Sequence, residues 1–503
     1  MSYAVYATVI IIATAGLIYE LIAAAAATYL LGDSLTQFST VIGGYLFAMG
    51  VGSYLSRYLR RGLGAWFVQV QILVGLVGGW SAALLFLAFV HTLYFRVVLY
   101  GLVGAIGVLV GLEIPLLLRL LRERLVMREL VAHVLSLDYL GALAASILFP
   151  LFLVPRLGLI RTALLFGLAN VSVGLWSTWI FRQEIVVARF LRAVAVAVML
   201  VLVGGLIAAE QLTTWTEARL YADEIILARS SPYQRIVLTR GGDDIRLFLD
   251  GHLQFSSRDE YRYHEALVHP ALASHPAPRR VLVLGGGDGL AMREILRYPG
   301  VESVTLVDLD PEMTRLFSSH LLLQRLNGAA FRDGRVRVVN EDAFVWLDRQ
   351  TDVFDAVVID LPDPHSFSLG KLYTRSFYRV LRSRLAAGGV AVVQATSPLF
   401  ARRSFWCIVE TVRSAGLTPH PYHVYIPAFG EWGFVLATMT PYQPYQPPQR
   451  YPDGLKFLTV QGTAALFAFP PDMDRVPVEV NRLDNQILVQ YYGEEWRRVF
   501  PSP

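Results

Sequence analysis

Hydrophobic residues are distributed very unevenly between the two halves of this chain. The first 210 residues hold about seven apolar stretches, each near the roughly 20 residues that a helix needs to cross a bilayer. The pattern predicts a transmembrane domain of about seven helices over residues 1–210. The first stretch continues past the length of a signal-peptide core and is followed by more stretches, which favours a span over a cleaved signal. The predicted spans are Ala4–Leu31, Phe38–Ser56, Ala65–Val90, Leu93–Leu121, Val131–Val154, Leu159–Phe181 and Phe190–Ala209.

Arginine placement predicts how these helices are oriented. Arginines gather after the second and fourth stretches and around the link between the sixth and seventh, while the alternate loops hold few. Under the positive-inside rule the Arg-rich loops and the N-terminus are cytoplasmic. Seven spans then place the rest of the chain outside, and one span more or fewer reverses this, so both placements stay open. The expected location is the cell (inner) membrane, as a multi-pass protein in contact with the lipid bilayer.

Three acidic residues interrupt the apolar stretches. Glu20, Glu113 and Asp138 lie inside predicted spans, where a charge is costly and usually faces a partner or a wet cavity. Two interpretations stay open: the three line a path for a cation such as a polyamine, or they are protonated and take part in helix packing.

The hydrophobic pattern changes after residue 210. From Glu224 to Phe255 apolar and polar residues alternate around Gly241-Gly242, which predicts a β-hairpin module over residues 211–258. Over residues 259–440 strand and helix patterns take turns, as in a doubly wound parallel sheet of the Rossmann-like, methyltransferase type, with an antiparallel edge pair at the end. Residues 441–503 read as a Pro-rich linker, Pro441–Pro452, and an extension of unassigned role. The predicted strands are Val281–Leu284, Val304–Asp308, Val336–Val339, Ala356–Asp360, Val390–Gln394, Thr418–Ile426 and Gly433–Thr438.

Charge and cysteine content exclude several functions. The first 210 residues hold 13 basic and 8 acidic residues, which leaves 31 and 32 for the rest of the chain. The second half is therefore nearly neutral and offers no basic face for a nucleic acid. Cys407 is the only cysteine, so neither an intrachain disulfide nor a cysteine metal site can form.

A glycine-rich turn gives the first chemical clue. Arg280–Gly289 reads as a buried strand that opens into Gly-Gly-Gly-Asp-Gly, a turn suited to a nucleoside ligand at the head of the next helix. Asp288 within it repels a pyrophosphate or the carboxylate of S-adenosylmethionine, whereas it attracts a nucleoside that carries an ammonium. Decarboxylated S-adenosylmethionine is such a molecule.

Further polar residues follow the other predicted strands, at the edge where this fold binds ligands. Asp308 can accept both ribose hydroxyls or serve as a turn residue. Asp342, followed by Ala343, can take an adenine amino group or cap the next helix. Asp360 and Asp363 lie in the run Asp360-Leu361-Pro362-Asp363-Pro364, where two prolines stiffen an acidic rim. A function fits this rim better than a solvated loop does.

Together these features resemble the spermidine synthase (polyamine aminopropyltransferase) family, in its bacterial membrane-fused type. The resemblance covers residues 224–440, and its motifs occur in the family's order. They are Tyr233-Gln234, Leu249-Asp250-Gly251 to Gln254, Asp259 to Glu265, Gly285 to Gly289 and Asp360 to Pro364.

The resemblance implies an enzyme that moves the aminopropyl group of decarboxylated S-adenosylmethionine to putrescine, giving spermidine and 5'-methylthioadenosine. It implies no metal and no cofactor beyond this cosubstrate. A homo-oligomer, dimer or tetramer, is also expected. The implied roles are cosubstrate binding by Gln234, Asp288, Asp308, Asp342 and Ala343, polyamine binding by Tyr263, His264, Asp288, Asp360 and Asp363, and proton acceptance by Asp360.

Two positions depart from the family pattern. Phe429 stands where a tyrosine that contacts the diamine is expected, so the acceptor amine stays open, with Glu431 as a compensating charge. Ala343 replaces the family's preferred glycine. Two other functions also stay open: an S-adenosylmethionine-dependent methyltransferase, which Asp288 and the Asp360/Asp363 pair disfavour, and a non-catalytic polyamine transporter or sensor.

Overall fold

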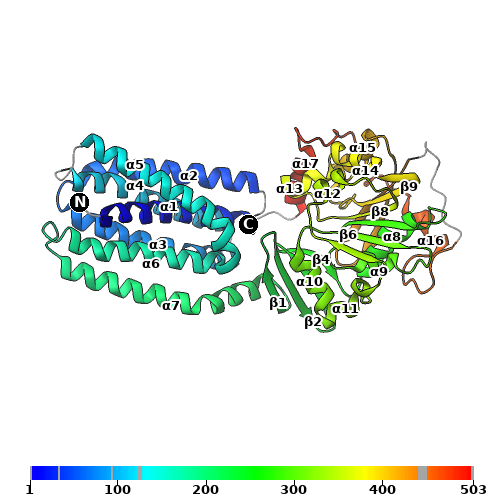
Figure 1. Ribbon diagram of the computed structural model, residues 1–503, viewed down its shortest axis with the longest axis horizontal. Helices are drawn as coiled ribbons and strands as arrows, with labels where there is room; N and C mark the ends of the chain where they lie inside the picture. The colour runs from blue at the N-terminus through cyan, green and yellow to red at the C-terminus, as the bar shows by residue number, and fades with distance from the viewer. Residues whose placement is uncertain (1–2, 32–33, 92–93, 123–126, 440–449, 500–503) are drawn as a thin grey trace. The chain divides into compact units, whose positions relative to one another are not determined.

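The structure, a computed structural model, describes residues 3–31, 34–91, 94–122, 127–439 and 450–499. The chain forms two compact units, residues 1–223 and residues 224–502 (Figure 1). Each unit is described by itself. Most of the predicted linker Pro441–Pro452 lies outside the described residues.

The first unit is entirely helical within its described part. Six of its segments are long and apolar enough to cross a membrane, and the longest of them is Glu129–Ile180, with 52 residues. At about 1.5 Å per residue a straight helix of that length would measure more than twice the thickness of a bilayer core. The helices are α1 (Tyr3–Leu31), α2 (Ser34–Leu55), α3 (Leu63–His91), α4 (Phe95–Leu121), α5 (Met127–Leu148), α6 (Val154–Ile180) and α7 (Ala188–Leu220).

The 52-residue segment is broken near its middle. A short π-helix, Phe149–Leu153, joins α5 to α6, and Gly158 has non-helical backbone angles, φ 73° and ψ 176°. A positive φ of this kind is open to glycine at little cost. Because α5 and α6 both pack against α1, the chain turns back at this break. The predicted boundary between the fifth and sixth spans falls here, whereas α7 runs past the predicted domain limit at residue 210.

The second unit begins with a four-stranded antiparallel sheet in the order β1-β2-β3-β4. Its strands are β1 (Glu224–Ser230), β2 (Arg235–Gly241), β3 (Asp244–Leu249) and β4 (His252–Ser256). One face of this sheet packs on helices α10 (Pro311–Ser319) and α11 (Leu321–Leu326), through a cluster that includes Leu238, Leu247 and Phe317. The predicted hairpin module thus lies against the helices that follow the second strand of the main sheet.

The main sheet has seven strands in the order β10-β11-β9-β8-β5-β6-β7. The central strands are parallel, and β10 and β11 form an antiparallel hairpin at one edge, as the sequence pattern predicts. The chain leaves β5 toward β6 and β7 and returns to β8 on the other side, so the strand order reverses between β5 and β8. The strands are β5 (Arg280–Gly285), β6 (Ser303–Val307), β7 (Val336–Val339), β8 (Phe354–Asp360), β9 (Leu385–Gln394), β10 (Thr418–Ile426) and β11 (Gly430–Thr438).

Helices cover both faces of this sheet. Since side chains alternate between the faces along each strand, each central strand contributes to two cores. In β5, Val281 and Val283 join a core with helices α8 (Glu260–Leu272) and α9 (Leu290–Ile295). Leu282 and Leu284 join the opposite core, which includes α12 (Ala343–Arg349), α14 (Arg375–Ser383), α15 (Arg402–Ser414) and α17 (Ile487–Val499). Figure 1 shows these last four helices together on one side of the sheet. The described part of this unit also contains the α-helices α13 (Phe367–Gly370) and α16 (Val460–Leu466) and the short 3-10 helices Ala330–Arg332 and Lys371–Tyr373.

Candidate active site

The glycine turn after β5 brings the predicted site residues together. Gly285 pairs with Asp360 of β8, has φ 78°, and would place a Cβ 2.2 Å from the Asp360 carbonyl oxygen, so a larger residue does not fit. Further along the turn, the backbone N–H of Gly287 donates to Asp308 Oδ2 at 3.0 Å. The turn, Asp308 and Asp360 therefore meet at the carboxyl ends of the strands, where the strand order reverses.

An acidic cluster with one histidine forms the centre of the site. Polar atoms of His264, Asp288 and Asp360 lie within 4.8 Å of one another. His264 comes from α8, Asp288 from the glycine turn and Asp360 from the end of β8. The Tyr263 hydroxyl, also from α8, donates to Asp360 Oδ1 at 2.7 Å. The structure thus brings four of the predicted residues to one point.

Glu260, one turn earlier on α8, controls the charge of His264. A Glu260 carboxylate oxygen lies 2.8 Å from His264 Nδ1, and the same carboxylate pairs with Arg293. Burial pushes the pKa of His264 down, but Glu260 and the nearby charges of Asp288 and Asp360 outweigh burial and raise it to about 9. His264 is therefore a cation at neutral pH. Glu260 lies in the motif Asp259 to Glu265 but had no predicted role, although its position four residues before His264 on a helix places the two side chains side by side.

Burial acts in the opposite direction on the two carboxylates of the cluster. It raises the pKa of Asp288 and of Asp360, and the positive charge of His264 opposes this rise. Burial and the charge of Asp360 also raise the pKa of Tyr263, so its hydroxyl stays protonated and donates. With both carboxylates ionised the cluster carries one net negative charge, which favours a cationic ligand.

Spacing alone would suit a metal ion at this cluster. However, a protonated imidazole has no free nitrogen lone pair, and His264 holds its proton up to a pKa of about 9. The donor set therefore fits an organic cation better than a metal. The expectation that no metal takes part stays a prediction.

Asp308 and Gln234 are connected through Asp310. Asp308 Oδ1 accepts from the backbone N–H of Asp310 at 2.8 Å, and Gln234 donates to Asp310 Oδ2 at 2.9 Å. Asp310 thus links the hairpin sheet to the end of β6. Burial raises the pKa of Asp308 to about 7, against the two backbone N–H groups that stabilise its anion. A carboxylate in this setting suits the hydroxyls of a sugar.

Asp342 already has partners for both of its carboxylate oxygens. Its Oδ1 accepts from the backbone N–H groups of Phe344 and Val345 at 3.0 and 3.1 Å, and so caps α12. Its Oδ2 lies 2.5 Å from Lys371 Nζ. The capping alternative is thus observed, and Ala343 is buried as the first residue of the helix.

Asp363 occupies a different environment from the cluster. Gln394 Nε2 donates to its Oδ1 at 3.1 Å, and hydroxyls of Thr396 and Tyr492 donate to its Oδ2 at 3.1 and 3.0 Å. Burial raises the pKa of Asp363 to about 6, while the three donors oppose the rise. Gln394 ends the predicted fifth strand, so the strand-end rule could have found it. No sequence signal singled out Tyr492, which lies 129 residues after Asp363.

Phe429, which departs from the family pattern, and Glu431, its suggested compensating charge, lie in the region of the β10–β11 hairpin. Phe429 packs against Trp432, with ring centroids 5.2 Å apart. Glu431 lies 3.0 Å from His423 Nδ1, a partner within the same hairpin. Glu431 is therefore already engaged, and its suggested role as a compensating charge at the diamine stays a hypothesis.

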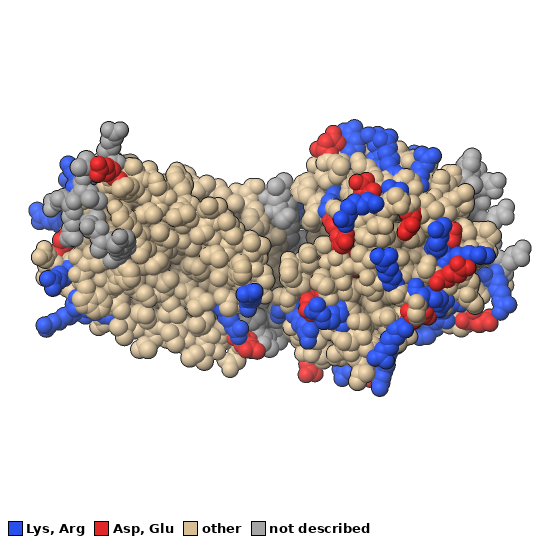
Figure 2. Space-filling model, viewed as in Figure 1, with Lys and Arg blue, Asp and Glu red and all other residues tan. Residues whose placement is uncertain are grey.

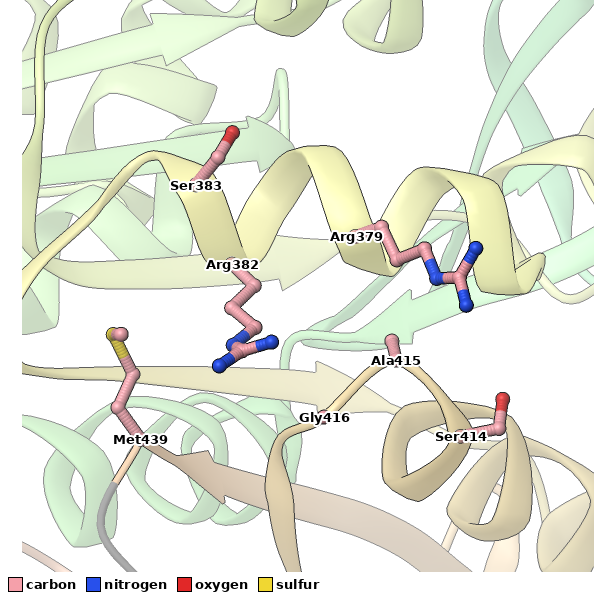
Figure 3. A pocket seen from close by; sticks show the side chains of 7 residues that line it. All are labelled: Arg379, Arg382, Ser383, Ser414, Ala415, Gly416 and Met439. Atoms are coloured by element: carbon pink, nitrogen blue, oxygen red, sulfur yellow. The ribbon is translucent and has the colours of Figure 1, made fainter.

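Hollows elsewhere on this unit do not coincide with the cluster. One of about 490 Å³ is lined by Arg379, Arg382, Ser383, Ser414, Ala415, Gly416 and Met439 (Figure 3). A second, of about 400 Å³, lies around Arg293, Asn327 and Arg335. Neither contains a predicted site residue, so the candidate site rests on its side chains and on its place in the sheet.

Similar proteins share both the site region and the rest of the chain. Residues 260–446 match the family described as the spermine/spermidine synthase domain. A polyamine aminopropyltransferase of Leptospira interrogans is 54% identical over 99% of this chain and 100% of its own length. Polyamine aminopropyltransferase 2 of Ralstonia nicotianae is 55% identical over 98% of each chain.

A more distant sequence relative also covers nearly the whole chain. Polyamine aminopropyltransferase 1 of Streptomyces coelicolor is 42% identical over 97% of this chain and 94% of its own. Among solved structures, that of spermidine synthase from Thermotoga maritima aligns with 49% of this chain and 85% of its own, at 25% identity and a TM-score of 0.44. The sequence relatives cover the helical unit as well as the sheet. This chain therefore belongs to the polyamine aminopropyltransferase (spermidine synthase) family.

Proposed function

We propose that this protein is a membrane-bound aminopropyltransferase that converts putrescine to spermidine with decarboxylated S-adenosylmethionine as cosubstrate. The observation that carries the proposal is the set of three carboxylates at the strand ends, Asp288, Asp360 and Asp363. Among the described residues their partners are neutral donors and the single cation His264. Cationic substrates with several charged groups complement such a site.

The proposed reaction is a direct displacement. The amine nitrogen of putrescine attacks the propyl methylene next to the sulfonium, the carbon–sulfur bond breaks, and its electron pair stays on sulfur as neutral 5'-methylthioadenosine. The nitrogen loses a proton, which Asp360 accepts. Tyr263 orients Asp360 through its 2.7 Å hydrogen bond. Alignment of nitrogen and sulfonium lowers the barrier, since positioning contributes roughly 7–11 kcal/mol in favourable cases.

The cosubstrate roles follow the positions of the remaining residues. Asp308 takes the ribose hydroxyls, with Gln234 beside it through Asp310. Asp288 takes the free ammonium of the aminopropyl group, with His264 setting the local charge. Asp342 and Ala343 bind the adenine end of the cosubstrate. Asp342 contributes to this end by capping α12 and by its contact with Lys371.

We further propose that the helical unit spans the cell membrane and that the protein forms a homo-oligomer. The middle of the face of this unit that Figure 2 shows consists of uncharged residues, and the charged residues lie toward its ends. Such a band, with six apolar segments of spanning length, fits the hydrocarbon core of a bilayer. Size measurement in detergent tests the oligomer.

The experiment is an assay of the full-length protein in detergent with decarboxylated S-adenosylmethionine and putrescine, in which both products are identified by mass. Equal amounts of spermidine and methylthioadenosine are expected. Formation of S-adenosylhomocysteine from S-adenosylmethionine would instead establish a methyltransferase. Binding without any product, with putrescine, cadaverine, agmatine and spermidine as acceptors, would favour a sensor or transporter.

A further inference from the structure

The C-terminal segment, from Asn481 to the end of α17 at Val499, packs against residues next to the site. Asn481 donates through Nδ2 to the carbonyl oxygens of Gly370 and Tyr373, both at 3.1 Å, and its own carbonyl accepts from the backbone N–H of Arg375. A Cβ on Gly370 would lie 2.5 Å from the Val489 side chain. The segment therefore packs without a gap on the 370–375 stretch, which also carries Lys371 and Tyr373.

Helix α17 is fixed from two more sides. Leu488 and Tyr491 are buried in the core on one face of the main sheet. Glu495 accepts from the backbone N–H groups of Arg403 and Ser404 at 2.7 and 3.1 Å, and so caps the start of α15. Because α17 is fixed both by the core and by α15, its other side chains lie at defined positions.

Tyr492 is the residue that this helix presents to the site. Its hydroxyl donates to Asp363 Oδ2 at 3.0 Å, and that oxygen also accepts from Thr396. The partners of Asp363 among the described residues are neutral donors, so its anion depends on each of them. Thr396 lies two residues after the end of β9 and has a positive φ of 57°, an uncommon conformation for this residue type.

We propose that Tyr492 is a positioning residue of the acceptor subsite, which holds the Asp363 carboxylate in place to bind the second ammonium of a diamine. The C-terminal segment then completes the active site. This inference rests on the proposed function, and it names the acceptor class as an amine with a second cationic group at its far end.

The charge of Asp363 gives the inference a pH signature. Among the described residues, the titratable groups that face Asp363 are the hydroxyls of Tyr263, Tyr373 and Tyr492. Since Tyr492 donates to the anion, loss of its hydroxyl raises the pKa of Asp363 further above its value of about 6. The resulting defect is then largest near neutral pH and smaller in alkaline buffer.

The test compares Tyr492→Phe with Tyr491→Phe in the full-length protein. Tyr491 is the matched control, because it lies on the same helix but faces Arg403, whose guanidinium is 3.8 Å from its ring centroid. Two acceptors are used: putrescine, and 1-aminobutane, which lacks the second amine. Methylthioadenosine affinity serves as the measure of an intact fold.

For Tyr492→Phe we expect the putrescine KM to rise about tenfold near pH 7, the effect of one hydrogen bond to a charged group, with kcat changed less than about twofold. The rate with 1-aminobutane and the methylthioadenosine affinity stay at parent values. An unchanged putrescine KM overturns the inference, as does an equal loss with both amines or the same loss in Tyr491→Phe. A parent protein without aminopropyl transfer would instead overturn the proposed function.

Discussion

The two carboxylates of the Asp360–Pro364 loop lie three residues apart, yet their surroundings differ. Asp360 has a cation, His264, close by and one hydroxyl donor, Tyr263. Asp363 has three neutral donors, Gln394, Thr396 and Tyr492. The first arrangement leaves a carboxylate with free acceptor capacity, as a base requires. The second holds a carboxylate still, as an anchor for a fixed charge requires.

The largest effect is expected from removing the proposed base. Asp360→Asn should lower kcat by about 10² to 10⁴, the usual contribution of a positioned general base. Calorimetric affinity for methylthioadenosine should stay close to that of the parent, since Asp308 and Gln234 are the proposed contacts to the nucleoside. A strong loss of nucleoside binding would show that Asp360 acts in binding.

A smaller effect, on a different constant, is expected at the anchor. Asp363→Asn should raise the putrescine KM by about ten- to a hundredfold, because the far ammonium loses its charged partner. Steady-state kinetics with putrescine measure this. If the KM stays at the parent value, the second ammonium binds elsewhere and the contrast between the two carboxylates has no functional meaning.

Asp288 offers a further comparison with Asp360. Both carboxylates lie close to His264, but Asp288 is proposed to bind the cosubstrate. The parent should bind decarboxylated S-adenosylmethionine more tightly than S-adenosylmethionine by about 1–3 kcal/mol, and Asp288→Asn should narrow this difference. Calorimetry with both nucleosides gives the comparison. Equal affinities in the parent would favour the methyltransferase interpretation.

The pH dependence of acceptor binding offers a test without mutation. Burial raises the pKa of Asp363 to about 6, so the carboxylate takes up a proton as the pH falls through that value. The putrescine KM should therefore rise up to about tenfold per pH unit below pH ~6 and level off above pH ~7. A KM that is flat down to about pH 5 would contradict the anchor role.

Much of this arrangement could be predicted from the sequence, because local rules determine it. The carboxyl ends of parallel strands meet at one edge, which places Asp308 and Asp360 beside the glycine turn. Tyr263 and His264 were predicted from the family motif and not from a local rule, and the structure brings both of them to Asp360. The alternation of strands and helices predicted the seven strands within a few residues.

Other features depend on contacts between distant parts of the chain. Tyr492 reaches Asp363 only because α17 packs on α15 and on Gly370, and no local pattern encodes that packing. Asp342 was open between a cap and a ligand, and the Lys371 contact that engages its second oxygen comes from 29 residues away. At Gly158 the hydropathy pattern predicted the boundary between the fifth and sixth spans, but it did not predict the non-helical backbone angles found there.

The central claim, that one loop divides proton acceptance from substrate anchoring, is tested most directly by two saturation curves in one methylthioadenosine-release assay. As the putrescine concentration rises, the rate of Asp363→Asn should reach a plateau within about threefold of the parent rate, because a high concentration of substrate compensates for weaker binding. Asp360→Asn should stay at least about 100-fold below the parent at every concentration. If Asp360→Asn reached the parent plateau, or if both variants levelled off equally low, the division between the two carboxylates would be wrong.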